Sequence, residues 1–220
     1  MNNKVQYTNL AVAIGMALVS TAVFADDTKF ADFAPLAVSA GPTADEATPI
    51  TFGNPTFVQK SIIDRETQLA EGYANSGNFD MNTLNETGKD KGRYIFTVFE
   101  TDTSGVQRHD RKTGKTETVW QSPGVAPALN SHVAFDASYW TPWGTYITAE
   151  EAWSPNPNTE TQTYGRLFEL KNPTKAPGIK VGESNNGAVF VHQNVIPRTA
   201  HEGIQFDKAG NIYFIDELNG

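Results

Sequence analysis

The sequence predicts an all-β protein: a β-propeller of four-stranded antiparallel blades, incomplete in this chain. From Arg93 onward, short segments rich in β-branched and aromatic residues alternate with polar turns, and no convincing helix lies between them. Two segments, 144–151 and 210–217, share a pattern in which a glycine precedes a strand that ends in two carboxylates. A β-sandwich is the alternative, but it would show more even strand spacing and no repeated acidic strand ends.

The predicted strands follow one another in order along the chain. Residues 94–99 are strongly β-forming, and Gly105 and Gly114 supply turn positions that favour positive φ. The full set of expected strands is 94–99, 106–109, 117–121, 131–136, 141–151, 165–170, 187–192, 202–207 and 210–216.

The two acidic strands indicate an internal repeat. Aligning Gly144 with Gly210, which are 210 − 144 = 66 residues apart, places Glu150 on Asp216 and Glu151 on Glu217. Each acidic strand is preceded by a Phe-Asp pair, at 135–136 and at 206–207, which we take as equivalent strand ends. The two aspartates are 207 − 136 = 71 residues apart, so we expect a longer turn at 138–143 in the first repeat.

Three regions are expected along the chain. Residues 1–25 are predicted to be a signal peptide, because Lys4 precedes an apolar run too short for a comfortable membrane span, and Val23 and Ala25 place small side chains at the cleavage site. A membrane anchor is the disfavoured alternative. With no twin arginine, we expect general secretion to the periplasm or the exterior, and no membrane association after cleavage.

Residues 26–92 are expected to be an extended leader and a loop-rich segment, with one weak helical pattern at 61–73 and a loop at 75–92. Residues 93–220 form the partial propeller. A blade takes about 40–50 residues, so this region holds about three blades, whereas closure needs at least about four. The sequence ends on a hairpin-turn signal, Asn219-Gly220, and we expect it to be the front part of a longer protein.

The composition narrows the possible chemistry. The formal net charge of −8 disfavours non-specific nucleic-acid binding and suits hard cations. The absence of cysteine excludes disulfides, thiolate metal sites and a cysteine nucleophile.

The candidate functional residues are carboxylates at strand ends, which would converge if the strands face a common axis. Several carboxylates in one cavity need a cation to stay ionised, although acidic residues also end strands simply because they solvate turns. His201 is equally well interpreted as a metal ligand or as a hydrogen-bonded histidine, and Arg198 as an anion-binding or a solvated arginine. The carboxylates considered are Glu150, Glu151, Glu202, Asp216 and Glu217.

Three short motifs resemble a known family. Thr141-Pro142-Trp143-Gly144-Thr145, continued by Thr148-Ala149-Glu150-Glu151, resembles the TPWGTxLTCEE signature of the PhoX-type alkaline phosphatases. His201-Glu202 and Ile215-Asp216-Glu217 resemble that family's FxHE and TED segments, in the same order. The resemblance covers roughly residues 93–220.

The resemblance implies a six-bladed propeller with calcium and iron at its centre that hydrolyses phosphate monoesters outside the cytoplasm. Carried over by position, it implies that Glu150, Glu151, Glu202 and Asp216 are metal ligands. Asp136 stands where the family has an iron-bridging cysteine; an aspartate binds hard metals, but a thiolate-bridged iron pair is excluded.

The resulting hypothesis is a secreted hydrolase of small phosphorylated substrates that uses calcium, with iron as a second candidate metal. Asp136 joins the four glutamate and aspartate ligands, and Arg198 is the candidate catalytic residue that holds the substrate anion. Two alternatives stay open: a non-catalytic, calcium-stabilised propeller that binds a partner, and a lactonase- or phytase-like propeller hydrolase.

Overall fold

The computed structural model describes residues 58–64, 77–126, 131–152 and 164–218. The chain divides into two compact units, Met1–Gln59 and Lys60–Gly220, and the strands of the described residues all belong to the second. The predicted signal peptide, the leader up to residue 57 and most of the weak helical pattern at 61–73 lie outside the described residues.

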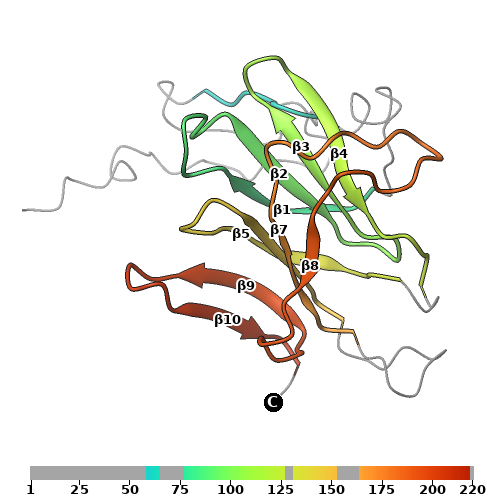
Figure 1. Ribbon diagram of the computed structural model, residues 1–220, viewed down its shortest axis with the longest axis vertical. Coiled ribbons are helices and arrows are strands. Elements are labelled where there is room, and N and C mark those ends of the chain that lie inside the picture. Colours follow the sequence, from blue (N-terminus) through green and yellow to red (C-terminus); the bar gives the residue numbers. More distant parts are fainter. Residues whose placement is uncertain (1–57, 65–76, 127–130, 153–163, 219–220) are drawn as a thin grey trace, which may run out of the picture. The chain divides into compact units, whose positions relative to one another are not determined.

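The described residues form ten strands in three antiparallel sheets and no helix, which confirms the all-β class (Figure 1). Among these residues there is accordingly no helix with the length and apolarity to cross a membrane. The first sheet has the order β1-β2-β3-β4, the second β5-β6-β7-β8, and the third holds β9 and β10. Their bounds are β1 Phe79–Leu84, β2 Tyr94–Phe99, β3 Gly105–Asp110, β4 Lys115–Gln121, β5 Phe135–Trp140, β6 Tyr146–Glu150, β7 Leu167–Leu170, β8 Phe190–His192, β9 His201–Phe206 and β10 Ile212–Asp216.

Most predicted strands are present, with three corrections. The loop expected at 75–92 contains β1, so the first sheet has four strands. The strand expected at 131–136 begins at Phe135 and runs through the predicted turn to Trp140, whereas residues 141–145 make the turn before β6. Phe206-Asp207 is not equivalent to Phe135-Asp136, because Phe135 begins β5 whereas Phe206 ends β9.

The three sheets follow one another in chain order, and their first strands lie side by side. β1 contacts β5 and β5 contacts β9, while β2 also contacts β5 and β6 contacts β9 (Figure 1). Within each sheet the later strands lie progressively farther from these contacts. Within each sheet, the beginning of the first strand pairs with the end of the second strand.

Aromatic side chains fill the space between the first two sheets. Phe96 of β2 stacks on Trp140 and Tyr146, with ring centroids 5.7 and 5.0 Å apart. Trp120 of β4 stacks on Phe135 at 5.7 Å. A second apolar cluster joins the second sheet to the β9–β10 hairpin. It consists of the side chains of Ala137, Ile147, Ala149, Leu167 and Ile204. Burying such large apolar surfaces supplies most of the stabilisation of the sheets.

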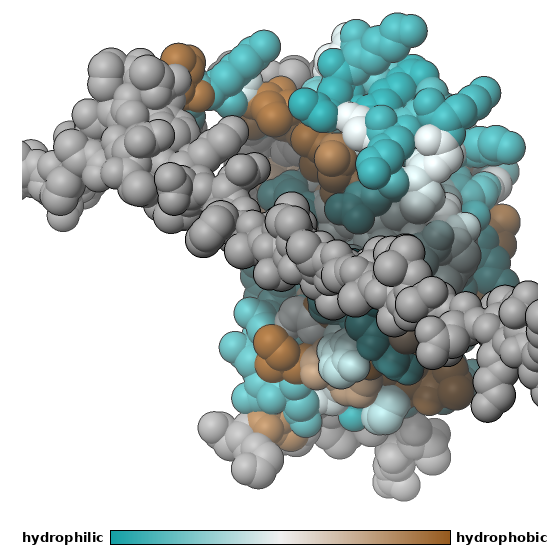
Figure 2. Space-filling view, turned by 90° about the vertical axis from the view of Figure 1, so that its left-hand side faces the viewer, coloured by the Kyte–Doolittle hydropathy of each residue, from teal (hydrophilic) through white to brown (hydrophobic). Residues whose placement is uncertain are grey.

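Much of the exposed surface of the first sheet is polar, although Met81 and Leu84 of β1 are also exposed. Figure 2 shows hydrophilic side chains gathered toward the top of the view, where this sheet lies. Residues 111–114, the turn between β3 and β4, are all exposed.

Phe135 is the most informative core position to test. Its side chain is fully buried and contacts the rings of Trp120, Phe168 and Phe190 at centroid distances of 5.7, 5.6 and 6.0 Å. We predict that Phe135→Ala lowers the free energy of unfolding by about 3–5 kcal/mol, because it leaves a cavity. In urea unfolding, Val181→Ala is the control: this side chain is 71% exposed and should change stability by no more than about 0.5 kcal/mol. Equal losses in both variants would contradict the assigned core.

Candidate functional site

The same irregularity occurs in the pairing of the first and second strands of all three sheets. Phe79 pairs with Phe99, Phe135 with Glu150, and His201 with Asp216, and the register shifts immediately afterwards. In each case two residues of the first strand oppose one residue of the second, which is the arrangement of a β-bulge. The first of the two bulged residues is Asp80, Asp136 or Glu202.

A second set of carboxylates lies next to the bulges. Glu100, Glu151 and Glu217 each directly follow the second strand of a sheet. Their backbone N–H groups donate to the carbonyl oxygens of Asn78, Ala134 and Ala200 at 2.9, 2.8 and 3.0 Å, and each of these residues immediately precedes a first strand. This repeated bond holds each glutamate beside the bulged carboxylate of its own sheet.

The bulged carboxylates interact with one another across the sheets. The side chain of Asp136 lies between those of Asp80 and Glu202 and is only 7% exposed. Burial, followed by the neighbouring Glu202 and Asp80, raises the pKa of Asp136 to about 9. Among the described residues, no hydrogen-bond donor reaches the buried Oε2 atom of Glu202. A positively charged ligand would therefore stabilise the ionised form of these three carboxylates.

The glutamates that follow the second strands form a similar group. Glu151 lies between Glu217 and Glu100, and burial together with these two neighbours raises its pKa to about 7. Glu100 also accepts a hydrogen bond from the Asn78 side-chain amide at 3.0 Å. The six carboxylates of these two groups are called the acidic centre below: Asp80, Glu100, Asp136, Glu151, Glu202 and Glu217.

Glu150, a predicted metal ligand, has a different environment. Its side chain is fully buried and pairs with Arg166, whose Nε donates to Oε2 at 2.9 Å and whose Nη2 donates to Oε1. The backbone N–H groups of Arg166 and Val133 also donate to Glu150. Burial raises the pKa of Glu150, and the Arg166 contacts oppose that shift. Glu150 thus already has a cationic partner, and its role as a metal ligand stays a prediction.

The remaining predicted residues lie at the edge of the acidic centre. Asp216 accepts hydrogen bonds from the backbone N–H groups of Ala200 and Leu218 at 3.2 and 3.1 Å. His201 is fully buried, with its ring 5.2 Å from that of Phe214, and burial lowers its pKa. His201 supports the start of β9 from inside the fold.

Arg198 lies near two other basic side chains, Arg166 and His192. Its Nη1 lies 3.5 Å from the carbonyl oxygen of Tyr164, and the Arg166 guanidinium lies 5.9 Å from the Tyr164 ring. Arg166 and His192 both contact Phe168, at 5.2 and 5.4 Å. Burial lowers the pKa of Arg198 and of His192, and the charge of Arg166 lowers both further. The charge of Glu150 opposes this shift at Arg198, so two guanidinium groups lie near one buried carboxylate.

The donor set of the acidic centre suits hard cations. Carboxylate oxygens are the ligands that calcium prefers, and iron(III) is also a hard acid, whereas no thiolate exists in the chain. The described residues include no group of three His, Asp or Glu side chains arranged to hold a metal ion as they stand. Asp136 and Glu151 instead each contact two other carboxylates, as expected where protons take the place of cations.

Two members of the acidic centre, Asp80 and Glu100, were not among the predicted residues. A signal for Asp80 exists, because Phe79-Asp80 repeats Phe135-Asp136. The equivalence of the glycines is confirmed: Gly144 and Gly210 have φ values of 89° and 87° and precede β6 and β10. Asp136 and Glu202 are equivalent positions, since each is the second residue of its strand. They are 202 − 136 = 66 residues apart, which is the same spacing as that of the two glycines.

No known family model matches this chain, and no curated protein sequence matches it either. The functional argument therefore depends on the geometry of the acidic centre and of the basic side chains Arg166, Arg198 and His192.

The raised pKa of Asp136 leads to a pH-dependent stability. The folded protein holds this proton up to pH about 9, whereas the ordinary pKa is 3.8, so its stabilising contribution is complete below pH about 4 and is lost as the pH rises to about 9. We predict that, in EDTA, the difference in unfolding free energy between the natural protein and Asp136→Asn falls steadily over that interval. Urea unfolding at several pH values measures it, and a difference that stays constant with pH would contradict the shift.

Proposed function

We propose that the three sheets are consecutive blades of a β-propeller whose inner strands are β1, β5 and β9. Four observations support this: antiparallel sheets in chain order, adjacent first strands, a repeated bulge and a repeated backbone hydrogen bond. In a propeller the first strands line a central channel, so equivalent residues of neighbouring blades face one another.

We infer that the acidic centre binds a hard cation and that the protein is a secreted, metal-dependent hydrolase of phosphate monoesters. The threefold recurrence of a carboxylate at the bulge is the observation that carries this proposal, because turn solvation does not explain why carboxylates of neighbouring sheets contact the buried Asp136. Calcium fits the oxygen donors, and iron is the second candidate.

The acidic and basic residues would have different roles in binding the cation and the substrate. Asp136, Glu202 and Glu151, together with Asp80, Glu100 and Glu217, would hold the cation, which when bound polarises the phosphoryl oxygens. Arg198 would bind the phosphate from the side through its guanidinium. Glu150 would keep Arg166 in position against Tyr164 and Phe168, and this fixes one wall of the site.

Two other functions are compatible with the same centre. A non-catalytic propeller stabilised by calcium would use the acidic centre for folding alone, and a lactonase- or phytase-like enzyme would use the cation on another substrate. The positive charge of Arg198, which interacts with Glu150, would favour an anionic substrate, and this would separate phosphate esters and phytate from neutral lactones.

Phosphate release from p-nitrophenyl phosphate, with calcium and iron added to metal-free protein, tests the proposal. We predict that Glu202→Gln lowers the rate by at least about 10-fold, because it removes a cation-binding carboxylate. Glu86→Gln is the matched control: Glu86 is exposed just after β1, at the opposite end of the sheet from Asp80, and the rate should not change.

The outcomes separate the three functions. Calcium at 100 times its Kd should raise the free energy of unfolding by about 2.7 kcal/mol. Stabilisation by calcium with no turnover would support the non-catalytic binding function. Turnover of lactones or phytate alone would support the lactonase- or phytase-like function. If calcium caused no stabilisation and the protein showed no turnover, the acidic centre would be ruled out as a cation site.

A further inference from the structure

A concave site lies at the opposite end of the sheets from the acidic centre. It is a hollow of about 590 Å³ between the β1–β2 turn, the β5–β6 turn and the segment after β7. The strand pairing shows the separation, since Leu84 pairs with Ile95 and Trp140 with Tyr146, whereas Asp80 and Asp136 lie at the other ends of β1 and β5. This site therefore does not belong to the proposed hydrolase centre.

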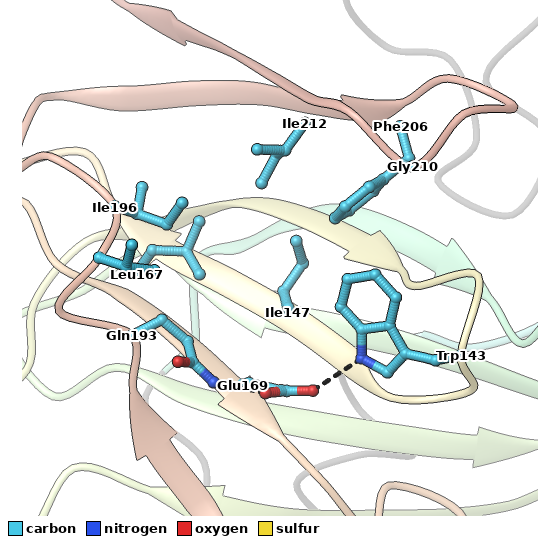
Figure 3. A pocket seen from close by; sticks show the side chains of 10 residues that line it. Trp143, Ile147, Leu167, Glu169, Gln193, Ile196, Phe206, Gly210 and Ile212 are labelled. Atoms are coloured by element: carbon cyan, nitrogen blue, oxygen red, sulfur yellow. Dashed lines mark hydrogen bonds between the residues drawn. The ribbon is translucent and has the colours of Figure 1, made fainter.

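Trp143 lies on the rim of this hollow, and its orientation is fixed although it is 60% exposed. Trp143 also lines a neighbouring pocket, which Figure 3 shows, and there its indole N–H donates to Oε1 of Glu169 at 2.9 Å and its ring meets that of Phe206 edge-on at 5.3 Å. Glu169 is itself held by the side chains of Thr145 and Gln193. A large aromatic surface held toward solvent loses little entropy on binding a ligand.

The other walls of the hollow are also braced. The Asn85 side chain bridges the β1–β2 turn, donating to the Asp90 carbonyl and accepting from the Tyr94 N–H, each at 2.7 Å. Arg108 donates to the carbonyl oxygens of Pro173 and Ala176, on either side of Thr174 and Lys175, at 2.9 and 3.0 Å. The hollow is therefore formed before any ligand binds.

The charges in the hollow favour an anion. Lys89 and Lys175 line it, both are exposed, and neither forms an ion pair within the described part of the chain. Its one carboxylate, Asp90, lies 3.5 Å from Arg93. In a chain with a net charge of −8, two lysines beside a fixed indole make a local site of opposite sign.

We propose that this hollow binds an anionic carbohydrate. A pyranose ring presents an apolar C–H face that packs on the indole of Trp143, while its acidic groups pair with Lys89 and Lys175. Its hydroxyl groups have partners in the hydroxyl of Thr174 and the carboxylate of Asp90. The proposal is independent of the hydrolase function, because it uses none of the residues of the acidic centre.

Tryptophan fluorescence of the full chain, titrated with trigalacturonate in EDTA, tests this site without metal at the acidic centre. Trigalacturonate should bind, whereas maltotriose, which has the rings without the charge, and citrate, which has the charge without the rings, should bind at least about 10-fold more weakly. The double variant Lys89→Gln/Lys175→Gln should weaken trigalacturonate binding by at least about 10-fold.

Matched variants make the result decisive. Lys112→Gln, at an exposed lysine outside the hollow, should leave the affinity unchanged. Trp143→Ala should weaken binding strongly and Trp143→Phe less, as measured by calorimetry because the reporter is lost. The proposal is overturned if trigalacturonate does not bind, if citrate or maltotriose binds as tightly, or if the lysine double variant behaves like Lys112→Gln.

Discussion

Mutual repulsion among carboxylates is the constraint around which this fold is arranged. Three sheets each place a bulge at the same point, and each bulge aims an acidic side chain toward its neighbours. Burial makes the cost larger, because charge is stabilised less away from water. The raised pKa values of Asp136 and Glu151 mean that protonation reduces this repulsion. A bound cation would displace those protons and interact with the carboxylates more strongly.

Two neighbouring glutamates show how local structure decides which carboxylate contacts other carboxylates and which is neutralised by an arginine. Glu150 points into the second sheet and is neutralised by Arg166, whereas Glu151, one residue later, joins Glu100 and Glu217. Successive side chains of a strand point to opposite faces, so an Asp-Glu or Glu-Glu pair at a strand end serves both purposes. One member braces the sheet, and the other belongs to the acidic centre.

The sequence predicted the strands well where composition is decisive. Residues 94–99, with six β-forming side chains in a row, match β2, and the glycine repeat correctly placed Glu151 and Glu217 at equivalent positions. β1 was missed because 77–92 is rich in Asn, Gly and Asp, and its strand depends on pairing with β2 rather than on its own propensity. The bulges were also not predictable, since they arise from the register between strands. Without them Asp136 appeared to match Asp207, which instead accepts hydrogen bonds within the β9–β10 turn from Ala209 and Asn211.

The central claim is that the acidic centre exchanges protons for a hard cation. Titration calorimetry of calcium into the metal-free protein at about pH 7, in two buffers with different ionisation heats, measures both events in one experiment. The account predicts saturable binding whose apparent heat differs between the buffers because protons leave Asp136 and Glu151, and a smaller difference for Asp136→Asn. Absence of binding, or binding with the same heat in both buffers, would contradict it.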